Sequence, residues 1–395
     1  MKRTTRYYFA SAAMDFALYV FYGAIPFYLM GLGAESFELG IMQTIISISY
    51  IIVALLAGRI SDRIPRIFLI KAGCILAVIS FFCLPITGTI HQVYCLALLI
   101  GLATGIFWPP LQAAIADEAS GTELGGLLGN FNLAWSFGKA LGFLVCGLTI
   151  ALFKNVGSSQ DSGDIAIKIP FVLAGTAALL NFFILPGLFA SNPVQNQRLP
   201  LQENGEPAAK KRKFLAVAWL ANFVAFGVSG VLANQYPRLS KEIGITEFQF
   251  NFYLFCVILC QLIGFWMLMK STWWHYRKKP LLSVQIVMIA ALLMLGITRK
   301  FLLVLLTAPV IGLGFSLSYF SSIFYSLRTD LGKGKNAGIH ESILRTGNFI
   351  FPLVGGWLTI YAGLMSPYIF GFAFGLLIII IQILILCGKN ETCET

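Results

Sequence analysis

The chain has 395 residues, of which 58% are hydrophobic and 11% are charged, and its mean hydropathy is +0.81. A soluble globular chain carries about a quarter charged residues, so this composition excludes a soluble enzyme, a disordered chain and a nucleic-acid-binding domain. The formal net charge of +11 must then reflect where basic residues lie relative to a membrane. We expect a protein that is mostly surrounded by lipid.

Stretches that are long and apolar enough to cross a bilayer follow one another along the whole chain. A transmembrane helix needs about 20 apolar residues. The twelve candidates are 7–31, 38–59, 67–87, 91–117, 124–153, 168–189, 214–237, 247–270, 280–298, 301–326, 337–362 and 366–388. The sequence therefore predicts an all-α membrane protein with twelve transmembrane helices.

Two connections are longer than the others, residues 154–167 and 190–213. The second is rich in Pro, Gln, Asn and charged residues, which is typical of a flexible linker. We therefore expect an N-terminal six-helix bundle in 1–190, a cytoplasmic linker in 191–213 and a C-terminal six-helix bundle in 214–395.

The basic residues indicate the orientation. With a cytoplasmic N-terminus, twenty Lys and Arg residues fall on the cytoplasmic side. Six fall on the other side: Lys154, Lys168, Arg238, Lys241, Arg299 and Lys300. Cytoplasmic loops collect Lys and Arg, so we expect both termini in the cytoplasm of a multi-pass protein of the bacterial inner membrane. The cluster 210–213 fits the same rule, with a lipid-binding patch or a nuclear signal as alternatives.

The two halves of the chain resemble each other weakly. Segment 129–148 aligns without gaps on 338–357, and three glycines coincide. The first and seventh stretches also align and place Asp15 opposite Asn222. Repeated six-helix halves are typical of transporters, whose substrate sites lie near the middle of the membrane.

The loop after the second stretch reads GRISDRIPR, residues 58–66. Its Gly58, Asp62, Arg63 and Arg66 match motif A of the major facilitator superfamily, and the chain resembles that family over nearly its whole length. The resemblance implies twelve helices in two pseudo-symmetric six-helix bundles, an alternating-access transporter and no enzymatic activity.

The family's motif C also has partial counterparts. Its pattern is matched in the fifth stretch by Gly138, Gly142 and Gly147, and in the eleventh by Gly347, Pro352, Gly355 and Gly356. In the family this motif is associated with antiporters, so the resemblance favours export in exchange for protons. The fourth stretch, in contrast, lacks the arginine of the family's motif B.

Motif A carries a further implication. In the family, arginines of this loop pair with a carboxylate and hold the cytoplasmic side closed in the outward-open state. Here the resemblance assigns that role to Arg66 or Arg63 with Asp117. A simple anchor for the membrane topology is the alternative.

One carboxylate lies about two helical turns inside the first stretch. Asp15 shares a helix face with Tyr19 and Tyr22, and ionisable residues within spans are costly and usually functional. A carboxylate withdrawn from water can take up and release a proton near neutral pH, so Asp15 is the candidate proton carrier. A contact to a cationic substrate and a structural pair are the alternatives.

Two equivalent helices carry polar stripes. The fifth stretch carries Asn132, Trp135, Ser136 and Lys139, and the eleventh carries Glu341, Arg345 and Asn348. If both stripes face the centre, Lys139 and Arg345 either grip an anionic group or neutralise carboxylates, and Glu341 is a second proton-coupling candidate. A buried Asp15–Lys139 pair and an i,i+4 Glu341–Arg345 pair are the structural alternatives.

Further candidates for substrate binding come from the second half. They are Asn222 in the seventh stretch, and Tyr319 and Ser322 on one face of the tenth. With three histidines, no CxxC motif and no Walker or HExxH motif, we expect no metal, no cofactor and no enzymatic or ATP-driven activity.

We therefore expect a secondary active transporter that moves a small organic solute by alternating access, with proton-coupled export as the main hypothesis. A proton-coupled symporter that imports an organic anion or nutrient is an alternative, favoured by Lys139 and Arg345. A transporter-like sensor is another. The expected partners are a small-molecule substrate, protons and the lipid bilayer, without nucleic acid, and a monomer is expected.

Overall fold

The computed structural model describes residues 3–61, 63–118, 124–156, 160–185, 187, 207–327 and 333–387. Within these ranges the chain forms thirteen α-helices and one 3-10 helix, with no strand. Twelve of the helices are long and apolar enough to cross a membrane. The prediction of an all-α protein with twelve spans is confirmed.

The helices fall into two groups along the chain. The first group contains α1 (Arg3–Gly31), α2 (Ser36–Ile60), α3 (Arg66–Cys83), the 3-10 helix η1 (Leu84–Ile86), α4 (Ile90–Asp117), α5 (Leu124–Val156) and α6 (Gln160–Ile184). The second group contains α7 (Ala208–Asn234), α8 (Tyr236–Glu242), α9 (Glu247–Met269), α10 (Lys278–Ile297), α11 (Phe301–Leu327), α12 (Lys333–Ala362) and α13 (Ser366–Cys387).

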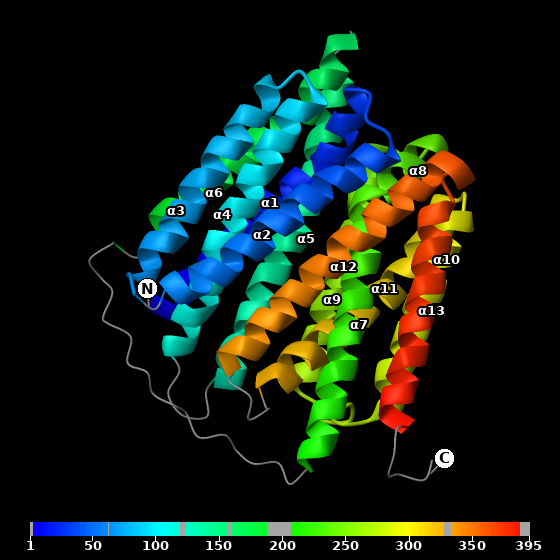
Figure 1. Cartoon of the computed structure of the whole chain (residues 1–395). Coiled ribbons are helices and arrows are strands. Elements are labelled where there is room, and N and C mark those ends of the chain that lie inside the picture. Colours follow the sequence, from blue (N-terminus) through cyan, green and yellow to red (C-terminus); the bar gives the residue numbers. More distant parts are fainter. Residues whose placement is uncertain are drawn as a thin grey trace.

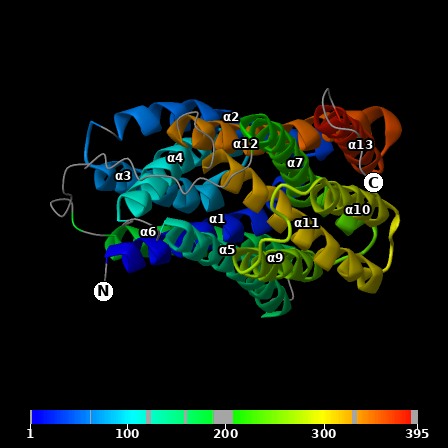
Figure 2. The same cartoon turned by 90° about the horizontal axis from the view of Figure 1, so that it is seen from below.

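Helix α1 lies inside the first group, where it packs on α5 and α6 and buries residues around its whole circumference. In the second group, α7 packs on α11, α12 and α13. The groups meet along two seams, where α5 packs on α9 and α2 packs on α12 (Figures 1 and 2). Side chains of α1, α5 and α12 can therefore approach one another at the centre.

Helix α1 begins and α13 ends at the same end of the bundle, which we call the terminal face (Figure 1). The α1–α2 and α12–α13 connections lie at the other end, the opposite face. Gly33 and Gly363 turn the chain there with φ of 90° and 73°, a backbone conformation that is cheap for glycine and strained for other residues.

Glycines allow the central helices to approach closely. A Cβ atom at Gly138 of α5 would lie 2.0 Å from the carbonyl oxygen of Ala12 in α1. In the second group, a Cβ at Gly347 of α12 would lie 2.1 Å from the carbonyl oxygen of Phe223 in α7. In both helix pairs, α1 with α5 and α7 with α12, a glycine thus allows close contact between the main chains, as is common between membrane helices.

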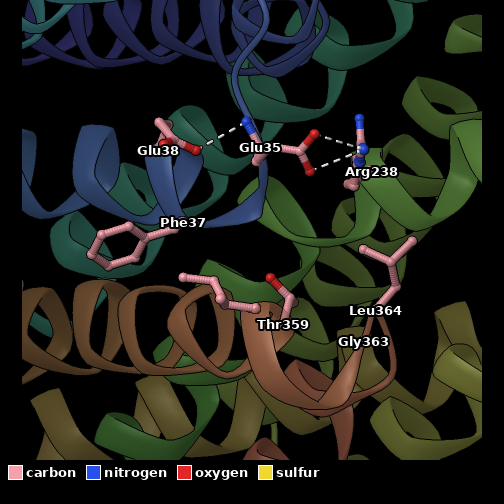
Figure 3. Close-up of a pocket in the computed structure, with 8 residues that line it drawn as sticks. Glu35, Phe37, Glu38, Arg238, Thr359, Gly363 and Leu364 are labelled. Atoms are coloured by element: carbon pink, nitrogen blue, oxygen red, sulfur yellow. Dashed lines mark hydrogen bonds and ion pairs between the residues drawn. The ribbon is translucent and has the colours of Figure 1, made fainter.

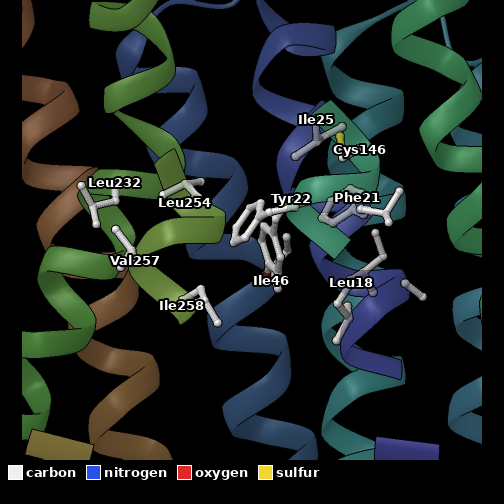
Figure 4. Close-up of a cluster of buried hydrophobic side chains, with 14 of the residues drawn as sticks. Leu18, Phe21, Tyr22, Ile25, Ile46, Cys146, Leu232, Leu254, Val257 and Ile258 are labelled. Carbon is white, nitrogen blue, oxygen red and sulfur yellow. The ribbon is translucent and has the colours of Figure 1, made fainter. Parts of the chain in front are cut away.

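The apolar side chains divide between core and lipid. Figure 4 shows a buried cluster in which Leu18 and Phe21 of α1 lie on one side and Leu254 and Ile258 of α9 on the other, with Tyr22 between them. Large apolar side chains are also exposed on outer helices, for example Phe183, Leu302 and Leu384. In a helix bundle of this length, such a surface is suited to lipid contact.

Three boundaries differ from the sequence-based expectation. Residues of the expected loop 154–167 are mostly helical, because α5 continues to Val156 and α6 begins at Gln160. The short helix α8 was not predicted. Helix α7 begins at Ala208, directly after Pro207, so residues 210–213, which were expected in the linker, are helical. Ala, Lys and Arg are strong helix formers, while the linker residues 188–206 lie outside the described ranges.

Candidate functional site

Four charged side chains from three helices lie near one another in the middle of the bundle. Asp15 of α1 and Lys139 of α5 are buried, with 6% and 4% of their surface exposed, and Glu341 and Arg345 of α12 are half-buried. Lys139, Arg345 and Glu341 are near enough to Asp15 for their charges to interact with its carboxylate. The two polar stripes predicted on equivalent helices therefore do face a common region.

Lys139 is held by aromatic rings. Its Nζ lies 4.4 Å from the centroid of the Tyr19 ring and 6.0 Å from that of Trp135, a geometry in which the ring faces attract a cation. Asp15 and Lys139, both of which the structure describes, form no ion pair within 4.0 Å. The expected alternative of a direct Asp15–Lys139 pair is therefore not formed, and each charge is available to another partner.

Glu341 connects the two groups of helices. Tyr50 Oη of α2 donates to its Oε2 at 3.0 Å, and Gln112 Nε2 of α4 donates to its Oε1 at 3.1 Å. The guanidinium of Arg345 stacks on the Tyr50 ring at 4.0 Å and forms no ion pair with Glu341 within 4.0 Å among the described side chains. The i,i+4 pair considered from the sequence is thus wrong, because Tyr50 and Gln112 reach the carboxylate from the facing helices.

Aromatic rings from both groups form a wall beside these charges. Trp135 Nε1 donates to Asn132 Oδ1 at 3.0 Å, which fixes the indole within α5. The Trp135 ring lies 5.5 Å from Tyr319 of α11 and 5.8 Å from Phe265 of α9, in edge-to-face contacts. Trp135 and Tyr319, both predicted for substrate binding, therefore meet across the seam between the groups.

A histidine that sequence reasoning did not select is in contact with this wall. His340 of α12 is fully buried, and its Nδ1 lies 2.7 Å from Ser322 Oγ and 3.4 Å from Asn222 Nδ2. Its ring packs edge-to-face on Tyr319 at 5.0 Å. The histidines were assessed only as metal ligands, although a polar residue inside a span is itself a signal of function.

Ser136, Tyr22 and Asn348 are the remaining residues that the sequence predicts to bind substrate. Ser136 is fully buried, and its Oγ has no hydrogen-bond partner in the described part of the chain. Tyr22 packs on Tyr19 and Phe21 and faces the second group (Figure 4). Asn348 is half-buried, and its main-chain carbonyl packs against Gly230 of α7.

The motif after α2 is partly visible at the terminal face. Arg66 Nη1 lies 2.5 Å from Asp117 Oδ2, which joins the start of α3 to the end of α4. Arg63 is exposed, and Gly58 lies in the last turn of α2. Asp62, predicted for the same motif, lies outside the described residues. Of the two pairs considered, the structure forms the one with Arg66.

The opposite face carries charge pairs between the two groups. Figure 3 shows Glu35 and Arg238 pointing at each other, with Arg238 Nη2 3.1 Å and 3.0 Å from the two carboxylate oxygens. They border a pocket of about 380 Å³ whose wall also includes Phe37, Glu38, Thr359 and Leu364. Lys154 Nζ of α5 lies 2.6 Å from Glu247 Oε1 of α9. These pairs join the two groups at this face.

The sequence family follows from comparison with known proteins. The model of the Major Facilitator Superfamily matches residues 7–339. The chain belongs to the major facilitator superfamily. It is therefore a multi-pass membrane transporter, not an enzyme, and it acts on small-molecule substrates within the membrane.

Two curated relatives of this superfamily member come from bacteria. The chain is 21% identical over 351 residues to the quinolone resistance protein NorA of Staphylococcus aureus (strain MRSA252), covering 85% of this chain and 84% of the relative. It is 25% identical over 203 residues to multidrug resistance protein 1 of Bacillus subtilis (strain 168), covering 51% and 47%.

Solved structures of transporters share the fold. The human organic anion transporter MFSD10 (TETRAN) superposes with a TM-score of 0.65 at 15% identity, covering 96% of this chain and 98% of that one. A point mutant of the nucleoside transporter NupG gives a TM-score of 0.68 at 11% identity, covering 97% and 100%. The predicted major facilitator fold is confirmed.

Proposed function

We propose that this transporter exports small amphipathic aromatic compounds in exchange for protons, with Asp15 as the proton-binding residue. The observation that carries the proposal is the placement of Asp15: a buried carboxylate in the middle of a span, within electrostatic reach of Lys139 but not paired with it. Glu341, which already accepts two hydrogen bonds, has the lesser role of joining α12 to α2 and α4.

The charges and rings of the site favour a particular kind of substrate. Asp15, Glu341, Lys139 and Arg345 sum to zero when all four are ionised, so a neutral or zwitterionic compound enters without leaving net charge in the membrane. The rings of Tyr19, Trp135 and Tyr319 supply flat apolar contacts. A basic group of the substrate would replace the proton on Asp15, and an acidic group would contact Lys139.

The relatives support the direction of transport. NorA and multidrug resistance protein 1 are named for resistance to drugs, which is consistent with export. We further propose a location in a bacterial plasma membrane, with the terminal face cytoplasmic and the protein acting as a monomer. Lys210–Lys213 and the arginines near α2 lie at that face, as expected for cytoplasmic basic residues.

Alternating access would arise from movement of an N-terminal bundle (1–190) against a C-terminal bundle (214–395). The Glu35–Arg238 and Lys154–Glu247 pairs close the opposite face. When the bundles rock, these pairs would separate, and contacts at the terminal face would form in their place. We propose that Arg66 and Asp117, paired within the first group, keep the ends of α3 and α4 rigid in that movement.

A second candidate function, proton-coupled symport of an organic anion, is favoured by one observation. Lys139 and Arg345 both stack on aromatic rings and have no carboxylate within ion-pair distance among the described residues. Protonation of Asp15 would then leave the site with a net positive charge, which strengthens anion binding.

The two candidate functions differ in whether protonation of the transporter weakens or strengthens substrate binding. We propose measuring the binding of norfloxacin, a zwitterionic quinolone, to the purified transporter in nanodiscs between pH 6 and pH 8. Exchange predicts that acid weakens binding, by up to about tenfold per pH unit where one proton competes. Tighter binding in acid would favour symport, and binding that does not depend on pH in the wild type would contradict both.

A further inference from the structure

His340 is a buried polar side chain to which the proposed proton and charge roles assign nothing. The imidazole is held at Nδ1 by Ser322 of α11 and Asn222 of α7, and its ring packs on Tyr319. Its Nε2 has no hydrogen-bond partner in the part of the chain that the structure describes. In a membrane protein an unmatched buried polar atom is costly, so a partner from outside the chain is expected there.

The atoms around Nδ1 determine what Nε2 offers. Asn222 directs its amide nitrogen, a donor, at Nδ1 from 3.4 Å, and the Ser322 hydroxyl can donate to the same atom from 2.7 Å, an arrangement in which Nδ1 is the acceptor. Neutral imidazole carries one proton, so that proton resides on Nε2. His340 thus presents an N–H donor with no acceptor among the described residues.

The neighbouring rings indicate what kind of molecule supplies the acceptor. Tyr319 packs on His340 at 5.0 Å and on Trp135 at 5.5 Å, so the imidazole lies at the end of a row of aromatic rings. A flat aromatic ligand packed on this row would bring a substituent on its edge toward His340. Trp135 belongs to the first group and the other two rings to the second, so such a ligand would contact both.

We propose that His340 Nε2–H donates a hydrogen bond to an oxygen acceptor, such as a ring carbonyl, on a planar aromatic substrate that packs against Tyr319 and Trp135. This inference rests on the proposed function, because it names the substrate class of the same site. It makes His340 a specificity-determining residue that distinguishes aromatic ketones from aromatic hydrocarbons of the same shape.

The test uses photolabelling of the purified full-length protein, with benzophenone as the probe. Benzophenone is an aromatic ketone that inserts into a nearby C–H bond under light, so its site of attachment can be mapped by mass spectrometry. The competitors are 9-fluorenone and fluorene, planar molecules of the same size that differ by one carbonyl oxygen. The concentration of each that halves the labelling of α11 and α12 is measured.

In the wild type, fluorenone should compete at about 5- to 10-fold lower concentration than fluorene, as expected for one hydrogen bond. His340→Ala should remove that preference while leaving the fluorene value within about twofold. His340→Gln, which keeps an amide donor, should retain part of the preference. His91→Ala is the matched control, because His91 is an exposed histidine at the start of α4.

Three results would overturn the inference: a wild type that is not labelled on α11 or α12, a wild type without preference for the ketone, and a preference that survives His340→Ala. If His340→Ala does not fold, His340→Gln is the deciding variant: a preference for fluorenone that is reduced but still present supports donation by His340, and a preference that is unchanged or lost contradicts it. The assay needs no pH gradient, so its failure is separate from a failure of proton coupling.

Discussion

Lys139 is the residue whose placement most directly relates charge to substrate choice. It is buried, packs on Tyr19 and lies within reach of Asp15 without an ion pair. A buried ammonium without a paired carboxylate carries a desolvation cost that an acidic group on a substrate would offset. We therefore expect Lys139 to select for such groups.

Replacement of Lys139 by alanine should weaken binding of compounds with a carboxylate by about tenfold, because one charge-assisted contact is lost. Binding of ethidium, an aromatic cation without a carboxylate, should change by less than about twofold. Equilibrium fluorescence titration of norfloxacin and ethidium measures both. Lys168→Ala is the control, since Lys168 pairs with Asp164 on α6; equal losses for both ligands would contradict the anion contact.

The sequence indicated some side chains of the site and not others. Asp15 and Lys139 were predictable because single charges stand out in apolar helices. Tyr50 and Gln112 were not, because tyrosine and glutamine are ordinary within spans, and their role appears only when α2 and α4 face Glu341. His340 carried a usable signal, but its partners Ser322 and Asn222 come from other helices.

Among the helices, glycines determine how closely the central ones approach one another. Gly138 brings α5 against the main chain of α1, and Gly347 brings α12 against the main chain of α7. These positions also align in the internal repeat. The four charged residues of the site lie on three of these helices, α1, α5 and α12, so their positions depend on the close contacts.

Gly138→Ala should destabilise the protein by about 1–3 kcal/mol, because the new methyl group meets the Ala12 carbonyl and α5 must move away from α1. Gly126→Ala in the same helix should be neutral or slightly stabilising, since nothing lies within 4 Å of a Cβ there and alanine favours helix. Thermal unfolding followed by size-exclusion chromatography compares the two. Equal stability of the two variants would argue against close packing at Gly138.

Glu341 relates α12 to the first group. Glu341→Gln should lower the unfolding free energy by about 1–2 kcal/mol, because a glutamine cannot accept from both Tyr50 and Gln112 with its two terminal atoms. Tyr50→Phe removes one of these donors and should cost about the same. Urea or thermal unfolding of the single and double variants gives their coupling, and fully additive effects would indicate that the side chains act independently.

For the whole molecule, the number and positions of the spans were predictable because apolar length alone identifies a transmembrane helix. The pairing of α5 with α9 and of α2 with α12 was not, since it depends on how two six-helix groups face each other. The short helix α8 was not predicted because it is only 7 residues long and follows α7 directly.

The opposite face should open when its charge pairs are removed. Glu35→Gln with Glu247→Gln removes the partners of Arg238 and Lys154, and exposed pairs contribute about 0.2–1 kcal/mol each. We expect a larger separation between spin labels at Gln92 and Lys300 in a protein whose native cysteines are replaced. Gln92 lies in the first turn of α4, and Lys300 directly precedes α11. Charge exchange (Glu35→Arg with Arg238→Glu) should restore the wild-type distances; unchanged distances in the Gln variants would show that these pairs do not hold the groups together.

Proton exchange at Asp15 is the central claim for the whole transporter, and proton movement tests it most directly. Proteoliposomes with a trapped pH indicator would be given a norfloxacin gradient without an initial pH difference. The account predicts that protons move opposite to the substrate in the wild type, and that Asp15→Asn abolishes this movement while norfloxacin still binds with reduced affinity. Protons that move with the substrate, or proton movement that persists unchanged in Asp15→Asn, would contradict it.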